Sequence, residues 1–429
     1  MATTELVLEK STVTQPDSNP TTPCCRFCSS LLQHTVVDLG TSPLCESYIS
    51  QEQLTQMEPF YPLHVYVCEK CFLVQMPAYV SPETIFSEYA YFSSYAESWL
   101  HHASKYVNNI ITRFGFDRSS CVIELGSNDG YLLQYFIEKG IPALGVDPAA
   151  NVAKVAIEKG VPTIVKFFGE QTARELIADG KRADLLVVNN ALAHVPNLND
   201  FVRGMKLLLA PLGITTIEFP HLLQLIDQNE FDTIYQEHFS YFCLLTAERV
   251  LAAHGITVFD VEELSTHGGS LRIYARHDND NSKPVTRRVE ELRRQEVAAG
   301  LTRLEHYFAF TEGVKESKRK LLEFLISVKR DGKSIAGYGA PGKANTLLNY
   351  CGVRNDFIDY TVDRNPYKQG KFLPGTHIPI FAPEKISETK PDYVLILPWN
   401  LKREICEQLS YIREWGGRFV VHIPELQVF

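Results

Sequence analysis

The sequence predicts an α/β protein with a cysteine-rich β module, a central doubly wound parallel sheet and a smaller C-terminal α/β domain. Three observations support this. Two close cysteine pairs fall within the first 71 residues, strands and amphipathic helices alternate from residue 121, and the alternation restarts near residue 334. Such alternation is typical of parallel sheets covered by helices on both faces. We expect divisions at residues 1–22, 23–80, 81–277 and 278–429.

Composition and charge argue against a nucleic-acid-binding or membrane-spanning protein. The 429 residues carry 42 Lys and Arg against 51 Asp and Glu, a net charge of 42 − 51 = −9, and 45% are hydrophobic. An acidic chain lacks the basic face that nucleic acid selects. No apolar run approaches the ~18 residues that span a bilayer, and the polar N-terminus does not resemble a secretory signal. We therefore expect a cytoplasmic protein, monomer or homodimer, without nucleic-acid or membrane partners.

The N-terminal region reads as a tail followed by a metal module. Residues 1–22 are rich in Thr, Pro and Ser, which is typical of disorder. Short strand-like runs then lie between two C-x2-C pairs; the four thiols are Cys25, Cys28, Cys68 and Cys71. Two such knuckles complete a tetrahedral Zn²⁺ site, and four thiolates leave no open position for water. We predict a structural zinc, with Cys24 as an alternative to Cys25.

The central and C-terminal segments alternate in a regular order. The expected central strands are 121–126, 142–147, 162–167, 183–190, 214–220, 258–264 and 271–276, and the expected helices are 130–140, 151–160, 200–213 and 246–255. Residues 278–331 are charged and mostly helical, as in a connector. Strands at 334–340, 356–363, 392–399 and 418–424, with helices at 343–352 and 402–416, predict a second Rossmann-like domain.

The turn after the first central strand indicates the cofactor. It reads E-x-G-x-x-x-G from Glu124 through Gly126 to Gly130, not the G-x-G-x-x-G that cradles a pyrophosphate. Its acidic groups, Glu124 and Asp129, suit a sulfonium, and Asp147 ends the next strand where a carboxylate can hold ribose hydroxyls. The order of these groups favours S-adenosylmethionine over NAD. Phe167 and Phe168 either flank the adenine or pack in the core.

Polar side chains gather at the predicted ends of later strands. Asn189, Asn190 and His194 follow the fourth strand, and a segment after the fifth contains Tyr235, Glu237 and His238. A base, its orienting carboxylate and a phenol donor are one interpretation of that segment. A surface turn or a core histidine is the other.

Six motifs together carry a resemblance to a known family. They are the cysteine pairs, Tyr89-x-Tyr91-x-Ser93-Ser94, Glu124–Gly130, Tyr235-Gln-Glu237-His238, His267-Gly-Gly-Ser270-Leu-Arg272, and Gly337-Tyr-Gly339 running to Lys343-Ala-Asn345. In this combination the chain resembles the zinc-containing, S-adenosylmethionine-dependent sugar C-methyltransferases, which act on dTDP-linked 4-keto-deoxysugars. The resemblance covers nearly the whole chain from Cys25, and it implies a class I methyltransferase core between the zinc module and the C-terminal domain.

The resemblance implies a base, His238, with further active-site groups around it. The expected catalytic residues are His238, Tyr235, Glu237, His194 and Tyr89. With the residues already named, the expected cofactor site comprises Tyr91, Ser94, Glu124, Gly126, Ser127, Asn128, Asp129, Gly130, Asp147, Pro148, Phe168, Asn189 and Asn190. Donors for a nucleotide-linked sugar are expected at His267, Ser270, Arg272, Lys343 and Asn345, although the last glycine turn serves equally well as a purely structural loop.

A mechanism follows from the acidity of a C–H beside a keto group. His238 removes the proton, Tyr235 or His194 donates to the enolate oxygen, and Glu237 orients His238 or contacts the sugar. Other acceptor atoms and a non-catalytic sugar-binding relative are alternatives.

Overall fold

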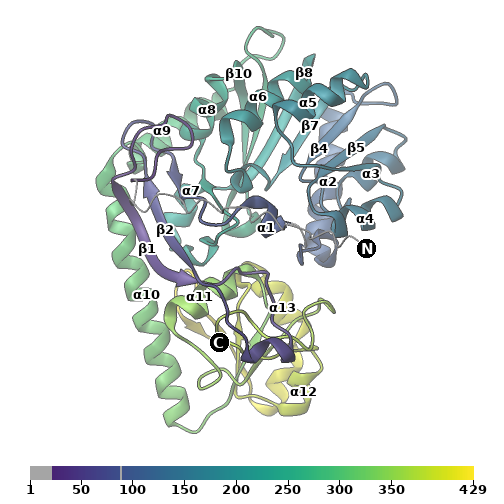
Figure 1. Ribbon diagram of the computed structural model, residues 1–429. Helices are drawn as coiled ribbons and strands as arrows, with labels where there is room; N and C mark the ends of the chain where they lie inside the picture. The colour runs from purple at the N-terminus through teal and green to yellow at the C-terminus, as the bar shows by residue number, and fades with distance from the viewer. Residues whose placement is uncertain (1–21, 87–88) are drawn as a thin grey trace, which may run out of the picture.

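The structure, a computed structural model, describes residues 22–86 and 89–429, so the tail expected over residues 1–22 lies outside the described residues but for Thr22. Figure 1 shows two α/β lobes joined along one side by a long helix, α10 (Leu304–Arg330), with the N-terminal strands packed beside it. Among the described residues, no helix has both the length and the apolar character that crossing a bilayer requires.

The N-terminal sheet includes one strand, β9, from the central part of the chain. Its antiparallel order is β1 (His34–Ser42), β2 (Tyr61–Val67), β3 (Val74–Gln75) and β9 (Ser240–Tyr241). In β2 the side chains alternate as in a half-buried strand, with Leu63, Val65 and Val67 inward. Because β9 begins two residues after His238, the cysteine module is tied directly to the predicted catalytic segment.

The central sheet has seven strands in the order β10-β11-β8-β7-β4-β5-β6. Its strands are β4 (Val122–Leu125), β5 (Ala143–Asp147), β6 (Thr163–Val165), β7 (Ala183–Asn189), β8 (Leu209–Pro220), β10 (Ile256–Leu264) and β11 (Ser270–His277). Its helices are α2 (Glu97–Phe114), α3 (Leu133–Glu138), α4 (Ala150–Glu158), α5 (Glu170–Ala178), α6 (Leu198–Leu208), α7 (Leu222–Asp227) and α8 (Leu244–Ala252).

The prediction of an entirely parallel sheet is wrong at one edge. Strands β6, β5, β4, β7 and β8 are parallel, but β11 runs antiparallel to both β8 and β10. Only the short segment 265–269 joins β10 to β11, and a parallel pair needs a crossover of a dozen or more residues. Strand β8 also begins at Leu209, five residues before its expected start, and shortens the preceding helix.

The position of the site follows from the parallel strands. All four residues of β4 and six of the seven in β7 are buried, as expected for strands covered on both faces. Because β4, β5 and β7 run parallel, their carboxyl ends lie at the same edge of the sheet, and this edge faces the second lobe in Figure 1.

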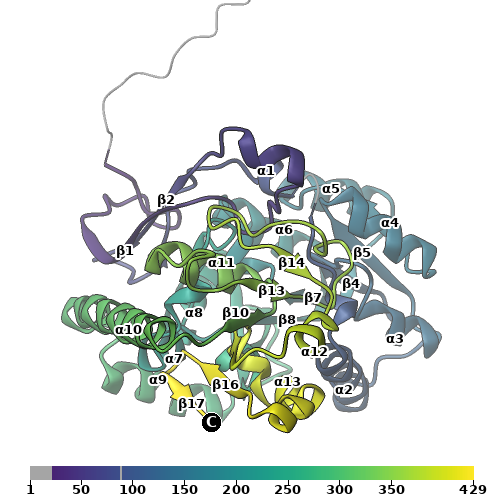
Figure 2. The same ribbon diagram turned by 90° about the horizontal axis from the view of Figure 1, so that it is seen from below.

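The second lobe contains a six-stranded sheet in the order β14-β13-β12-β15-β16-β17. Its strands are β12 (Ile335–Tyr338), β13 (Tyr360–Val362), β14 (Ile380–Phe381), β15 (Tyr393–Ile396), β16 (Arg418–Val421) and β17 (Gln427–Val428), and its helices are α11 (Gly342–Cys351), α12 (Lys385–Thr389) and α13 (Lys402–Gln408). Helix α9 (Arg287–Ala299) precedes α10 in the connector. Figure 2 views this lobe from below, with the central strands behind it.

Candidate active site and zinc centre

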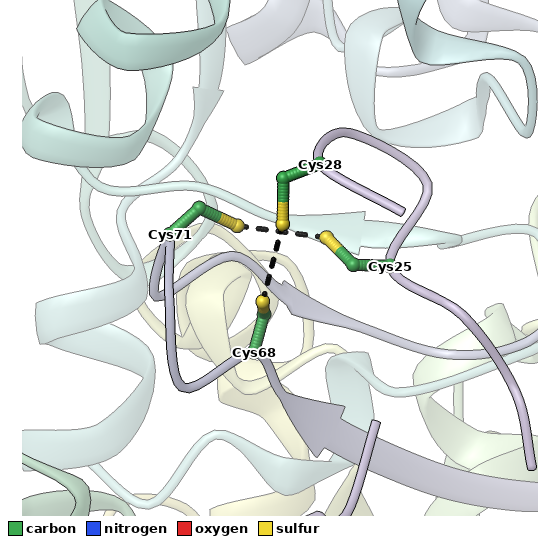
Figure 3. A group of neighbouring side chains, drawn as sticks. All are labelled: Cys25, Cys28, Cys68 and Cys71. Atoms are coloured by element: carbon green, nitrogen blue, oxygen red, sulfur yellow. Dashed lines mark hydrogen bonds between the residues drawn. The ribbon is translucent and has the colours of Figure 1, made fainter. Parts of the chain in front are cut away.

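The four predicted zinc ligands form one cluster. Two loops bring Cys25 and Cys28 against Cys68 and Cys71, and one ligand atom of each lies within 4.8 Å of all the others. Figure 3 shows the four side chains pointing toward a common centre. The Cys25–Cys71 and Cys28–Cys68 sulfur distances are 3.5 Å, near the ~3.8 Å that tetrahedral Zn–S bonds of ~2.3 Å require.

The surroundings of the cluster decide which N-terminal cysteine is the ligand. Cys25 is buried and accepts a hydrogen bond of 3.1 Å from Gln75 Nε2, whereas Cys24 is exposed and outside the cluster. The donor set is four thiols without an added water or carboxylate, which fits a structural zinc.

A cavity of about 680 Å³ separates the two lobes. Its walls include the carboxyl edge of the central sheet, the segment around residues 233–238 and, from the second lobe, residues 341–343, 398, 400 and 401. All five predicted catalytic residues line it: Tyr89, His194, Tyr235, Glu237 and His238.

His238 is held in one orientation by a backbone group. Its Nδ1 lies 2.7 Å from the Thr233 carbonyl oxygen, which can only accept, so Nδ1 carries the proton and Nε2 has the free lone pair. Burial and the neighbouring His194 keep the pKa of His238 well below its ordinary value. The ring is therefore neutral and can accept a proton at Nε2.

Glu237 does not orient His238, contrary to one of the two roles expected for it. Its carboxylate instead accepts hydrogen bonds from the Tyr89 hydroxyl at 2.8 Å and the Cys45 thiol at 3.2 Å. The orienting group of His238 is the Thr233 carbonyl. Burial and nearby Glu46 raise the pKa of Glu237 to about 7.

Two further rings surround His238. The centroid of Tyr235 lies 4.1 Å from that of His238, and the centroid of His194 lies 4.9 Å away. Burial lowers the pKa of His194 to about 4 and raises that of Tyr235 well above its ordinary value. Both groups are therefore neutral, and each can donate a hydrogen bond to an oxygen that gains negative charge.

The predicted cofactor residues divide into a lining set and a supporting set. Tyr91, Gly126, Asn128, Asp147, Pro148, Phe168, Asn189 and Asn190 line the cavity. Ser94, Glu124, Ser127, Asp129 and Gly130 do not line it, and contact of these five with the cofactor stays a prediction. Asp129 Oδ2 accepts the Ser94 backbone N–H at 3.2 Å and pairs with Lys159 at 3.3 Å, while its Oδ1 has no partner among the described residues.

The lining set fits an adenosyl ligand. Asp147 accepts the backbone N–H groups of Asn128 and Ala149, which fixes its carboxylate at the end of β5, and burial raises its pKa to about 6. The side-chain oxygens of Asn189 and Asn190 are buried and lack a partner among the described residues. Such acceptors match the hydroxyl and ammonium donors of S-adenosylmethionine.

Only two of the five predicted sugar-nucleotide residues line the cavity, His267 and Lys343. Arg272 forms a buried ion pair with Glu218, and its guanidinium lies 4.4 Å from the Tyr106 ring centroid. Burial alone would raise the pKa of Glu218, but Arg272 and His102 lower it to about 2. The Arg272 charge is thus compensated inside the central domain.

Ser270 and Asn345 have partners within the protein, and their contact with the substrate stays a prediction. The Ser270 hydroxyl donates to the Thr266 carbonyl at 3.0 Å. Asn345 Nδ2 donates to the Ser42 hydroxyl and the Pro43 carbonyl, each at 3.1 Å, and so links α11 to the cysteine module.

Three groups at the cavity could not be recognised from the sequence. Glu46 and Lys368 line it from the cysteine module and the second lobe, with 3.7 Å between Glu46 Oε2 and Lys368 Nζ. The Thr233 carbonyl is a backbone atom, whose role depends on loop geometry rather than residue type.

Comparison with known proteins agrees with this three-part architecture. Family models described as "Putative zinc binding domain", "Methyltransferase domain" and "C-methyltransferase C-terminal domain" match residues 25–86, 99–261 and 265–424. C-methyltransferase NovU of Streptomyces niveus is 36% identical over 404 residues, covering 94% of this chain and 96% of that protein.

Two further matches cover less of the chain. A ubiquinone biosynthesis O-methyltransferase of Methylobacterium sp. (strain 4-46) is 30% identical over 97 residues, which are 22% of this chain and 38% of that protein. The crystal structure of magnesium protoporphyrin IX methyltransferase from Synechocystis PCC 6803 with bound S-adenosylmethionine is 13% identical, with a TM-score of 0.32, and covers 41% of this chain and 78% of that chain. The full-length match to the Streptomyces protein decides the assignment: the chain belongs to the S-adenosylmethionine-dependent C-methyltransferases that carry an N-terminal zinc-binding domain.

Proposed function

We propose that the protein methylates a carbon next to the keto group of a nucleotide-linked 4-keto-deoxysugar, with dTDP as the nucleotide. The observation that carries this proposal is the neutral His238, whose Nδ1–H is fixed on the Thr233 carbonyl and whose Nε2 is left as a proton acceptor in the cavity wall. An oxygen or nitrogen acceptor is already nucleophilic, whereas a carbon acceptor must first lose a proton to a base.

The residues divide the reaction between them. His238 Nε2 takes the proton from the carbon beside the carbonyl, and the electron pair moves onto the carbonyl oxygen as an enolate. Tyr235 and His194 stabilise that oxygen as hydrogen-bond donors, an effect worth ~3–4 kcal/mol for one well-placed donor. Glu237 fixes the Tyr89 hydroxyl at the cavity wall and contacts the sugar.

The donor side is formed by the lining set at the carboxyl edge of the sheet. S-adenosylmethionine supplies an electrophilic methyl group when bound. Asp147 is placed to hold the ribose hydroxyls, Phe168 to pack on the adenine, and Asn189 and Asn190 to accept from the amino-acid portion. Binding both partners in one enclosed cavity aligns the carbon nucleophile with the methyl group.

The test uses dTDP-linked 4-keto-deoxysugars with ¹³C-labelled methyl donor, and NMR identifies the neighbour of the labelled carbon. In D₂O without methyl donor, we expect the proton next to the keto group to exchange. His238→Ala should abolish both exchange and methyl transfer, and Tyr235→Phe should slow methyl transfer ~10²-fold. His254→Ala, which removes a ring bonded to Asn199 outside the cavity lining, is the control.

Methyl transfer to oxygen or nitrogen, or exchange at the wild-type rate in His238→Ala, would refute the proposal. A cytoplasmic location and a monomeric or homodimeric state remain predictions. Light scattering of the zinc-loaded protein measures the second.

A further inference from the structure

A buried ammonium lies in the cavity wall without a carboxylate at ion-pair distance among the described residues. Lys343, in the first turn of α11, is 8% exposed, and its Nζ lies 4.8 Å from the Trp399 ring centroid. Within residues 22–86 and 89–429 the structure gives this Nζ no hydrogen bond and no ion pair. Because a buried charge is costly unless it is paired, the arrangement calls for an anionic ligand from the cavity side.

Two buried carboxyl groups lie near Lys343, whose positive charge acts to lower the pKa of each. Glu230 is 1% exposed and Asp232, in η4 (Phe231–Thr233), is fully buried. Trp399 Nε1 donates to Asp232 Oδ2 at 2.8 Å, while the other oxygen of Asp232 and both oxygens of Glu230 have no partner among the described residues. The indole therefore connects the ammonium to the acid pair.

A glycine allows this close packing. Gly268, with φ +95°, has no Cβ, and a Cβ there would lie 2.0 Å from Glu230 Oε1 and 2.4 Å from Trp399 Cη2. A larger residue would displace both the carboxyl group and the indole. Gly268 thus shapes the charge cluster, although Ser270 and Arg272, which follow it, do not line the cavity.

The protonation of the acid pair sets the charge beside Lys343. Burial raises the pKa of Glu230 to about 8, partly opposed by Lys343, and raises that of Asp232 to about 6. At pH 7, Glu230 is mostly protonated and Asp232 mostly ionised. Above pH 8, ionisation of Glu230 adds a second negative charge next to the place where an anion would bind.

We propose that Lys343 and the N-terminus of α11 bind the anionic phosphate portion of the acceptor, and that Glu230 is a positioning residue that keeps this site receptive only while it holds its proton. The backbone N–H groups of Gly342 and Lys343 stand at the positive end of a ten-residue helix, which favours phosphate oxygens. The inference rests on the proposed function in taking the acceptor to carry a nucleotide diphosphate.

The experiment measures binding of dTDP to the full-length, zinc-loaded protein by calorimetry between pH 7 and pH 9. The wild-type Kd should rise about fivefold or more over this range, because anion binding opposes ionisation of Glu230. Glu230→Gln, which mimics the protonated acid, should bind as the wild type does at pH 7 and lose the rise. Lys343→Met should bind about tenfold more weakly throughout, and Lys343→Arg should restore binding.

Proton uptake gives an independent measurement. In buffers of different ionisation enthalpy, the wild type should take up protons on binding dTDP near pH 8, and Glu230→Gln should not. The titratable groups facing Glu230 are Lys343, Asp232 and His267. Burial lowers the pKa of His267 to about 4, so neither it nor Asp232 changes charge in this range.

Equal pH dependence in the wild type and Glu230→Gln, or wild-type affinity in Lys343→Met, would overturn the inference and leave the methyl-transfer assay unaffected. Absence of dTDP binding to the wild type would overturn it as well. Loss of carbon methylation with the pH-linked binding intact would instead refute the proposed function alone. Glu312→Gln, on the exposed face of α10, is the matched control.

Discussion

At the scale of single residues, Glu237 predicts a pH dependence. Its ionised form accepts from Tyr89 and Cys45, and burial places its pKa at about 7. If the ionised form holds Tyr89 in place, kcat/KM falls as the pH drops through 7. Cys45→Ala removes a donor to the charged form, which raises the pKa, so the midpoint should move to higher pH by up to about one unit.

The conservative variant separates positioning from packing. Cys45→Ser keeps a hydroxyl donor at the same place, so its pH–rate profile should stay close to that of the wild type. Identical acid limbs in Cys45→Ala and the wild type would show that Glu237 is not the group that titrates.

A second prediction at this scale concerns Gly126 in the cofactor turn. Its φ is +73°, and a Cβ there would lie 2.8 Å from the Ala191 Cβ, across the cavity edge. Gly126→Ala should therefore weaken S-adenosylmethionine binding by about tenfold or more, measured by calorimetry, because the turn must shift. Gly160→Ala has a φ of +85° and no atom within 4 Å of the added Cβ. It shares the backbone strain of ~1 kcal/mol but should bind the cofactor normally. Equal affinities in the two variants would contradict this.

At the scale of elements, the pairing of β3 with β9 gives the zinc module a mechanical role. Val74 pairs with Tyr241 and Gln75 with Ser240, and the Met76 backbone N–H donates to the Phe239 carbonyl. The knuckle of Cys68 and Cys71 precedes β3 directly, so metal loss should loosen this edge of the catalytic segment.

Removal of zinc should therefore reduce methyl transfer more than cofactor binding. We expect a chelator to release one zinc per chain, to increase hydrogen exchange over residues 74–76 and 238–242, and to lower kcat. The Kd for S-adenosylmethionine should change less than threefold, because its site is on the other sheet. Unchanged exchange at residues 238–242 in metal-free protein would contradict the coupling.

Helices and strands with a regular hydrophobic pattern can be predicted from the sequence, but the strands and side chains that they contact cannot. The run at 183–190 and the helix at 343–352 have their expected types because local hydrophobic spacing determines them. β9 has only two residues, and it is a strand because it pairs with β3, more than 160 positions earlier in the chain. Arg272 looks like a phosphate ligand locally, but the buried Glu218 on the neighbouring strand binds its charge.

At the scale of the whole molecule, the candidate active site is assembled from three parts of the chain, so local motifs predict its residues but not their arrangement. Helix α11 contacts both other parts: Asn345 binds the cysteine module, and the Thr346 hydroxyl donates to the Ile234 carbonyl at 2.7 Å. Ile234 lies between Thr233 and Tyr235, so this bond connects the second lobe to the backbone that holds His238.

Thr346→Val should consequently affect catalysis as well as stability. It removes one buried hydrogen bond with little change of shape and leaves a carbonyl unpaired, which costs about 1–3 kcal/mol in the free energy of unfolding. The Ile234 carbonyl is next to Thr233, whose own carbonyl orients His238. We therefore expect kcat with the keto-sugar to fall several-fold, while the Kd for S-adenosylmethionine stays the same. Ser317→Ala, which removes the bond to His422 away from the cavity, should lower stability similarly and leave kcat unchanged. Urea unfolding and steady-state kinetics of the pair decide the matter: equal kcat values would mean that α11 merely joins the lobes, whereas a selective loss in Thr346→Val would show that the second lobe positions the catalytic segment.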